Sequence, residues 1–291
     1  MNWQGMLGLW WTVPAGLALM GYGGSLAGVT RPQRAVWVTA RVVEVHQPEH
    51  GDSKRPGIPV TVAFRDPDTG MEFRLRHAGR NNHVVDAAWL GREFPVRYPR
   101  GRPERFHLML DTVGETRGLG APNCMVFLLL VGLVVQSFFA RGWPTGLICL
   151  GGLLFLIGAL SRDIRGARAR ATLLDGAVAV PGRVVAVTKD VYTDGEGSEI
   201  VNHAPVVAFT TRGGILVTAL CREGIPKPGL SLGRELTIHY APADWSVLTP
   251  DLDHDRRDRA ATVRFIVMLR LAAIAAVATG ANSLFHLVPV T

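Results

Sequence analysis

The chain has 291 residues, of which 48% are hydrophobic and 19% are charged, and its mean hydropathy is +0.20. Its net charge of +7 comes mainly from arginine, because Lys54, Lys189 and Lys227 are the only lysines. Positive charge can indicate nucleic-acid binding, or it can flank membrane spans. No RNA- or DNA-binding motif accompanies the arginines, so we exclude nucleic acid as a partner.

Four apolar stretches are long enough to cross a membrane as helices. They cover residues 6–29, 121–140, 143–160 and 263–288. At about 1.5 Å per residue the first would reach roughly 36 Å, against a hydrocarbon layer of about 30 Å. It lacks the basic start of a cleaved signal peptide, so we expect it to remain as a span. The second and third are separated only by residues 141–142, which predicts a tight antiparallel hairpin.

The placement of arginine orients these spans. Arg141 alone lies on one side of the membrane, since residues 1–30 and those after Arg270 carry no Lys or Arg. The positive-inside rule therefore predicts that residues 31–120 and 161–262 are cytoplasmic and that both termini lie outside a cell inner (plasma) membrane. The arginines on the cytoplasmic side are Arg31, Arg34, Arg41, Arg102, Arg105, Arg117, Arg162, Arg165, Arg168, Arg170, Arg256, Arg257 and Arg259.

The two long segments between the spans repeat each other. The first and last matching blocks recur at the same separation, 183 − 41 = 142 and 232 − 90 = 142 residues. Matching blocks in one order indicate an internal duplication. The blocks are RVVEV (41–45) with RVVAV (183–187), PVTVAF (59–64) with PVVAF (205–209), and LGREFPVRY (90–98) with LGRELTIHY (232–240).

The repeated blocks have the pattern of β strands. Phe94, Val96 and Tyr98 alternate with Pro95 and Arg97, and the second copy alternates in the same way. A period of two with β-branched and aromatic residues is typical of a half-buried strand.

Each copy is predicted to be a small antiparallel β domain, a barrel or a sandwich. Residues 67–70 and 212–214 are turn signals that predict a central hairpin in each copy. The predicted β domains cover residues 35–112 and 178–252. We therefore expect an α+β membrane protein with four transmembrane helices and two β domains.

The order of these motifs resembles the domain-of-unknown-function 3592 family of bacterial membrane proteins. The resemblance covers residues 35–111 and 178–251, and it implies small β domains between membrane helices. The family pattern ends in Tyr-Asp-Pro, whereas this chain has Tyr98-Pro99 and Tyr240-Ala241-Pro242. A role that depends on that aspartate is therefore not carried over. The shared blocks contain no catalytic residue.

An acidic segment at residues 251–260 is the first candidate for chemistry. Asp251, Asp253 and Asp255 have the alternate spacing of a calcium loop. Such a loop also needs glycine at its sixth position and glutamate at its twelfth, where this chain has Arg256 and Thr262. We expect a solvated charged linker that leads into the fourth span.

The histidines and cysteines do not form a recognised metal site. His46 and His50 lie in a polar loop, and His77 and His83 flank another loop. Cys124, Cys149 and Cys221 have no CxxC spacing and are predicted to be packing residues. No Ser-His-Asp arrangement, nucleophile elbow or phosphate-binding glycine motif is present. We predict no catalytic, cofactor-binding or metal-binding residue.

Small residues suggest where the spans pack. Gly24 and Gly28 form a GxxxG pair in the first span, and Ala272, Ala276 and Gly280 form a stripe in the fourth. These two spans are predicted to pack against each other or against a second chain. The spans contain no Asp, Glu or Lys, which disfavours an ion or proton pathway.

These observations favour a membrane-anchored, non-enzymatic binding or scaffolding protein that presents two β domains to the cytoplasm. Its partners would be the lipid bilayer and either another protein or a second copy, through small-residue helix faces or β edges. The basic loop at residues 74–83 distinguishes the first copy and is a candidate contact. The alternative is an accessory or regulatory subunit of a transporter or cell-envelope machine.

Overall fold

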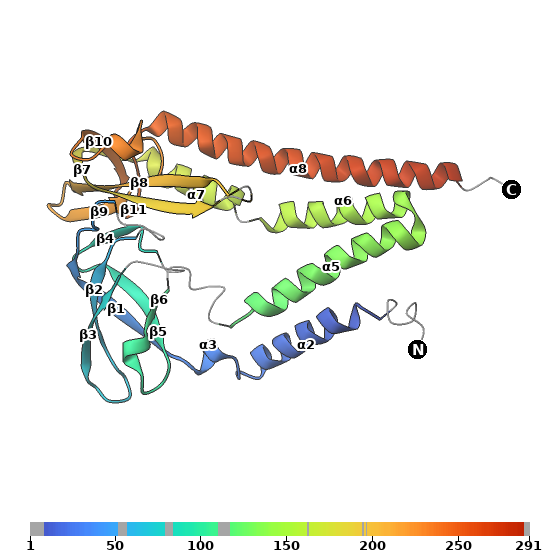
Figure 1. The fold of residues 1–291 in the computed structure, drawn as a ribbon, viewed down its shortest axis with the longest axis horizontal. Helices are drawn as coiled ribbons and strands as arrows, with labels where there is room; N and C mark the ends of the chain where they lie inside the picture. The colour runs from blue at the N-terminus through green and yellow to red at the C-terminus, as the bar shows by residue number, and fades with distance from the viewer. Residues whose placement is uncertain are drawn as a thin grey trace. The chain divides into compact units, whose positions relative to one another are not determined.

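The computed structural model describes two compact units with an α+β fold, as predicted (Figure 1). The described residues are 9–51, 57–78, 84–109, 117–161, 163–193, 195 and 197–287. The helical unit comprises Met1–Arg34, Val113–Ala167 and Arg259–Thr291, and the β unit comprises Ala35–Thr112 and Arg168–Asp258. The helices are α2 (Thr12–Leu26), α3 (Arg31–Arg34), α5 (Gly120–Arg141), α6 (Trp143–Leu160), α7 (Asp163–Asp175) and α8 (Leu252–Leu287).

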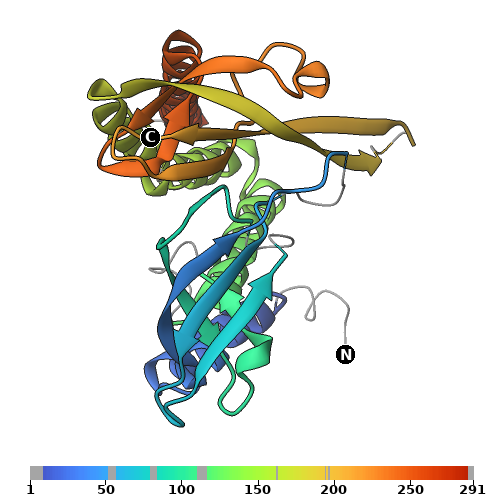
Figure 2. The same cartoon turned by 90° about the vertical axis from the view of Figure 1, so that its left-hand side faces the viewer.

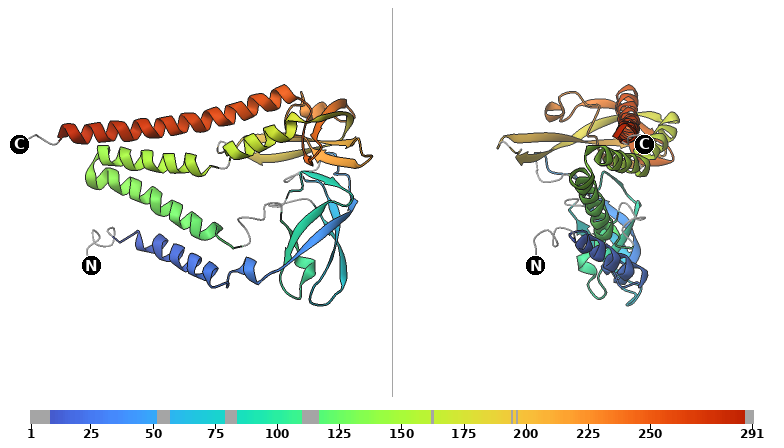
Figure 3. Two further views of the ribbon diagram at one scale, coloured as in Figure 1. Left: turned by 180° about the vertical axis from the view of Figure 1, so that it is seen from behind. Right: turned by 90° about the vertical axis from the view of Figure 1, so that its right-hand side faces the viewer.

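Within the described residues, three helices are long and apolar enough to cross a membrane: α5, the helix that begins at Trp143, and α8. Helix α2 has 15 residues. Residues 6–8 of the first predicted span lie outside the described residues, so a fourth span stays a prediction. The hairpin of α5 and α6 is present as predicted (Figure 3). Gly142 connects the two helices with a φ of +80°, a conformation that glycine adopts without strain.

Helix α2 packs against α5, and its glycines have roles that differ from the predicted GxxxG pair. Gly21 is the close-packing position, because a Cβ there would lie 2.9 Å from the ring of Pro122. Gly28 follows the end of the helix with a φ of +70°. The backbone N–H of Val29 donates to the carbonyl oxygen of Gly24 at 3.0 Å, which is a Schellman cap. The prediction that Gly24 and Gly28 form a packing pair is therefore wrong.

Helix α8 packs against α6 through small residues. A Cβ at Gly151 would lie 2.6 Å from the carbonyl oxygen of Ala273, and one at Gly280 would lie 2.5 Å from that of Pro144. Gly280 of the predicted stripe is thus a contact, whereas Ala272 is exposed and its neighbour Ala273 is buried in its place. In the described part of the chain, a small residue of α2 thus packs on α5, and small residues of α8 pack on α6.

The β unit contains two antiparallel sheets. The first has the order β3-β2-β1-β5-β6 and the second the order β11-β10-β7-β8-β9-β4. The hairpin of β7 and β8 extends beyond the other strands of its sheet (Figure 2). The strands are β1 (Val36–Val45), β2 (Val60–Arg65), β3 (Glu72–His77), β4 (Ala87–Trp89), β5 (Glu93–Tyr98), β6 (His107–Leu108), β7 (Val178–Thr193), β8 (Glu199–Thr210), β9 (Leu216–Leu220), β10 (Glu235–Ala241) and β11 (Asp244–Thr249).

The two sheets have the same topology, as a duplication requires. Without β4, the second sheet has the order β9-β8-β7-β10-β11, which matches the first strand for strand. The repeated LGR turn is also the same in both copies. Gly91 and Gly233 have φ values of +87° and +76°. Their N–H groups donate to the carbonyl oxygens of Val42 and Val184 at 2.8 and 2.9 Å, which anchors each turn on the opening strand.

The tyrosine of each repeated block fixes the central hairpin of its copy. Tyr98 and Tyr240 each pack on a phenylalanine of the preceding hairpin, with ring centroids 5.4 and 5.5 Å apart and planes inclined by 32°. The Tyr98 hydroxyl donates to Asp66 Oδ1 at 2.7 Å, and the Tyr240 hydroxyl accepts from the backbone N–H of Arg212 at 3.0 Å. The repeated phrase is therefore a structural element of the sheet.

One strand of the first copy is part of the sheet of the second copy. β4 belongs to the first copy in sequence, yet it pairs with β9 of the second, with Ala88 opposite Thr218. The first copy's core is continuous with second-copy side chains, among them Val206 and Leu220. The loop after β1 also contacts β7, where Gln47 Nε2 donates to the carbonyl oxygen of Val185 at 2.7 Å. Both predicted β domains thus lie in a single compact unit.

Candidate functional site

The described histidines among those singled out in the sequence each have a different partner. His46 Nε2 is 2.8 Å from the Thr61 hydroxyl, and His50 Nδ1 accepts from the backbone N–H of Val187 at 3.4 Å. His77 contacts the ring of Phe106, and His83 lies outside the described residues. Among the residues that the structure describes, no group of three or more His, Cys, Asp and Glu could hold a metal ion.

The acidic segment leads into the apolar part of α8, as expected, but it is the first part of that helix and not a linker, and its Asp255 side chain is buried and not solvated. Asp251 caps the helix, because its Oδ1 accepts from the backbone N–H groups of Asp253 and His254 at 2.9 Å each. These hydrogen bonds lower the pKa of the Asp251 carboxyl. The sequence analysis missed this helix start because it began the helix at the apolar stretch, at residue 263, and assigned the charged residues before it to a linker.

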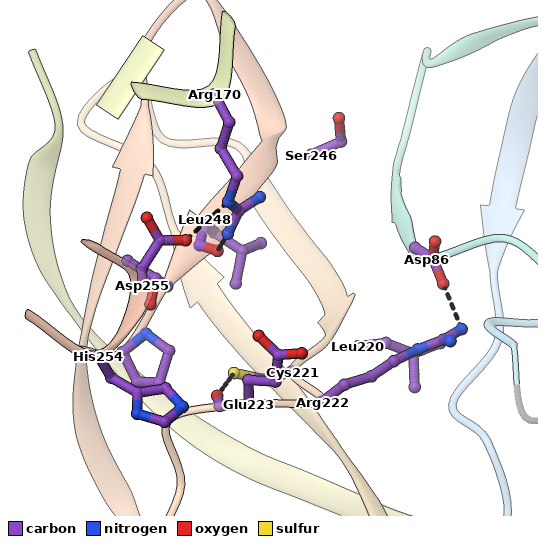
Figure 4. Close-up of a pocket in the computed structure, with 12 residues that line it drawn as sticks. Asp86, Arg170, Leu220, Cys221, Arg222, Glu223, Ser246, Leu248, His254 and Asp255 are labelled. Carbon is purple, nitrogen blue, oxygen red and sulfur yellow. Dashed lines mark hydrogen bonds and ion pairs between the residues drawn. The ribbon is translucent and has the colours of Figure 1, made fainter. Parts of the chain in front are cut away.

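A polar pocket of about 260 Å³ lies beside this helix start (Figure 4). Its walls come from α7, the first turn of α8, the ends of β9 and β11, and the segment just before β4. All of these parts belong to the β unit. The lining residues are Asp86, Arg170, Leu220, Cys221, Arg222, Glu223, Ser246, Leu248, Thr249, Pro250, His254 and Asp255.

An arginine of α7 lines the pocket and is held there by two hydrogen bonds. Arg170 Nε donates to Asp255 Oδ1 at 2.7 Å, and its Nη2 donates to the carbonyl oxygen of Leu248 at 2.8 Å (Figure 4). The Asp255 side chain is only 9% exposed. A buried carboxylate left without a partner is strongly destabilising, so this ion pair holds α7, β11 and α8 together.

Other charged groups of the pocket are also paired. Arg222 Nη2 lies 2.9 Å from Asp86 Oδ1 and joins the two copies, although both side chains are more than half exposed and the pair contributes little to stability. His254 Nε2 lies 3.1 Å from Asp258 Oδ2. The pocket can admit a small polar molecule, but its cations already contact carboxylates.

The pocket cysteine does not have the properties of a nucleophile. Cys221 is buried, and burial raises the pKa of its thiol to about 12. The thiol donates to the carbonyl oxygen of Glu223 at 3.3 Å. A thiol with such a pKa stays protonated at neutral pH, and it is the thiolate that reacts. Cys221 therefore acts as a packing residue, as predicted for it.

A second candidate site is strand β3, at the edge of the first sheet. Residues 74–77 of the predicted basic loop belong to this strand, and residues 79–83 lie outside the described part of the chain. Glu72, Arg74 and Arg76 are exposed, whereas Phe73 and Leu75 are half-buried. β3 thus combines a charged outer row with an apolar inner row.

No protein-family profile matches this chain, and no match was found among curated proteins or solved structures. The resemblance to the domain-of-unknown-function 3592 family therefore stays a prediction.

Proposed function

We propose that this is a membrane-anchored, non-enzymatic binding or scaffolding protein that presents its β unit to the cytoplasm. The observation that carries the proposal is the exchange of β4, with Ala88 of the first copy opposite Thr218 of the second. The exchange joins two repeats into one body with a shared core. A single rigid body with exposed sheet edges suits a platform for other proteins.

The orientation of this platform follows from arginine placement. The apolar helices anchor the chain, and the arginines that flank them favour a cytoplasmic β unit. The pocket supports a non-enzymatic role, since Arg170 is held by Asp255 and the Cys221 thiol stays protonated.

The test is crosslinking in intact cells that express the tagged full-length protein at its native level. We expect a stoichiometric protein partner in repeated recoveries from the membrane fraction. The control is Ala88→Pro, which removes a ladder donor between β4 and β9 and leaves the apolar helices unchanged. Recovery of the protein alone in every repeat, or a partner retained in full by Ala88→Pro, would contradict the proposal.

One observation favours the alternative role as a regulatory subunit of a transporter or cell-envelope machine. Helix α8 begins beside the polar pocket and continues without a break into its apolar segment. Arg170 on α7 is bonded to Asp255 on α8, so a molecule that displaces this ion pair would act on the first turn of a membrane helix. Flux across reconstituted vesicles that changes with Asp255→Asn would support this role.

A further inference from the structure

Strand β3 ends the first sheet, and its outer side is open in the described part of the chain. The sheet order places β2 on one side of β3 and no strand on the other. The register pairs Phe64 with Phe73 and Ala63 with Arg74. An edge strand presents unpaired N–H and C=O groups that can accept another strand.

The equivalent edge of the second copy is occupied. In that copy the register pairs Phe209 with Val217 and Ala208 with Thr218. Phe64 and Phe209 are equivalent, because each packs on the tyrosine of its repeated block. Arg74 therefore corresponds to Thr218, and Thr218 is paired with β4. The fold contains an example of the complex that β3 is built to form.

The backbone groups of Arg74 and Arg76 point to the open side. The N–H of Asp66 donates to the carbonyl oxygen of Met71 at 2.9 Å, which fixes the phase of the hairpin. Hydrogen-bonded pairs alternate along an antiparallel ladder, so Phe73 and Leu75 bond to β2, and Arg74 and Arg76 bond outward. The same alternation holds at β9, where the outward N–H of Leu220 donates to Asp86 at 2.7 Å.

The chain has no second strand of the β4 kind among its described residues. The positions equivalent to Ala87–Trp89 are 229–231, at the separation of 142 residues. They fall largely within the short 3₁₀ helix η2 (Pro228–Leu230) and not in a strand. The sequence that donates a strand to the second copy thus has no counterpart that could serve the first.

The charge of the edge selects the occupant. Arg74 and Arg76 are exposed on the outer row, and Arg65 of the neighbouring strand lies on the same face, opposite Glu72. Arg74 Nε lies 3.3 Å from Glu72 Oε1 in an exposed ion pair, so the three arginines still leave a net positive charge on this edge. Opposite charges across a ladder stabilise pairing, which favours an acidic strand. The half-buried inner row requires apolar side chains at alternate positions.

We propose that the open edge of β3 binds an extended segment of a partner protein in which acidic and apolar residues alternate. This inference rests on the proposed binding role and names its surface. The segment adds a strand to β3 as β4 adds one to β9. Its acidic side chains contact Arg74 and Arg76, and its apolar side chains lie beside Phe73 and Leu75.

The experiment measures fluorescence anisotropy of labelled peptides with the full-length protein in lipid nanodiscs. The probe is a nine-residue peptide of alternating valine and glutamate. Its controls replace glutamate with lysine or place proline at the centre. We expect the acidic peptide to bind at least tenfold more tightly than either control. Equal binding of the lysine peptide would overturn the proposal.

Two variants of Arg74 separate the contribution of its backbone N–H to peptide binding from that of its charge. Arg74→Pro removes an outward N–H without removing a bond to β2, and it should weaken the acidic peptide at least tenfold. Arg74→Thr installs the residue of the occupied edge and should weaken it only about threefold. Unchanged binding by Arg74→Pro would refute strand addition. If Arg74→Pro fails to fold, the double variant Arg74→Glu and Arg76→Glu decides, because it should reverse the preference toward the lysine peptide.

The oligomeric state tests whether the open edge binds a second copy of this chain. Mass photometry of nanodiscs should find the same state for the wild type and Arg74→Pro. A wild-type dimer that Arg74→Pro converts to a monomer would assign the edge to a second copy and overturn the proposal. A partner crosslinked equally by both proteins would leave the binding role intact and refute this surface. Loss of that partner in Arg74→Pro supports both.

Discussion

Two adjacent valines on β8 test whether the copies share one core. Val206 and Val207 are both 0% exposed. Their side chains lie on opposite faces of the strand, so Val206 packs in the core of the first copy and Val207 in that of the second. Val206→Ala and Val207→Ala are thus the same change, one residue apart, in different cores. Each serves as the matched control of the other.

The expected cost is the same for both variants. Each loses two buried methyl groups, at about 0.8 kcal/mol each for transfer, and the cavity raises the loss to about 2 kcal/mol. In a unit of this size about 1 kcal/mol lowers the unfolding midpoint by roughly 2–4 °C, so we expect a decrease of about 4–8 °C. Amides that exchange through global opening should exchange about 30-fold faster.

Hydrogen exchange of the full-length protein in nanodiscs gives the decisive readout. Peptides from β1 and β2 report on the first copy, and peptides from β10 and β11 report on the second. Because the core is continuous, we expect each variant to accelerate the slowest amides of both copies by the same factor. Acceleration confined to the first copy in Val206→Ala, or to the second in Val207→Ala, would show that the repeats open independently.

Four further predictions concern single side chains. Gly91→Ala should cost about 1–2 kcal/mol, because its φ is +87°, whereas Gly213→Ala, at a glycine without positive φ, should be nearly neutral in thermal unfolding. Hydrogen bonds to Asp66 hold its pKa below the ordinary 3.8, so its ionised form stabilises the fold above that pH and the gain is lost as pH falls through the folded-state pKa. Asp66→Asn should therefore reduce the loss of unfolding free energy as the pH falls below about 4. Cys221 should resist iodoacetamide at about pH 8 until the protein is denatured, and early labelling would contradict its burial. Arg270→Leu removes two hydrogen bonds to a carbonyl oxygen at the end of α6, at 2.6 and 3.2 Å, and should lower the aggregation temperature in detergent.

The alternation of apolar and polar residues predicted strands such as β5 correctly, because one face of the strand packs in the core and the other is more exposed. Phe94, Val96 and Tyr98 are buried in β5, as their alternation indicated. The duplication was also visible, since the repeated phrase holds the same turn in both sheets. Such features depend on residues close in sequence, where the backbone geometry leaves few alternatives.

Contacts between residues far apart in the chain could not be predicted from the sequence in this way. The Arg170 and Asp255 ion pair joins residues 85 apart in sequence, and only the fold brings them together. In α8, Ala273 and not Ala272 faces α6, and because the two side chains are equally small, composition could not tell which of them does so. The guanidinium of Arg270 likewise donates to the carbonyl oxygen of Gly158 in the last turn of α6, 112 residues away in sequence.

The asymmetry between the copies explains both the shared body and the open edge. If both repeats kept a strand at the position of β4, each could close its own sheet or exchange strands symmetrically. Here the first repeat retains Ala87–Trp89 as a strand, and the second has η2 in its place. One donor strand is therefore present for two acceptor edges, β9 and β3. The donor occupies β9, which fuses the repeats, and within the described residues β3 is left as an open edge that carries arginine where the occupied one carries Thr218. The same divergence that made one body from two repeats thus created a surface with a charge of its own.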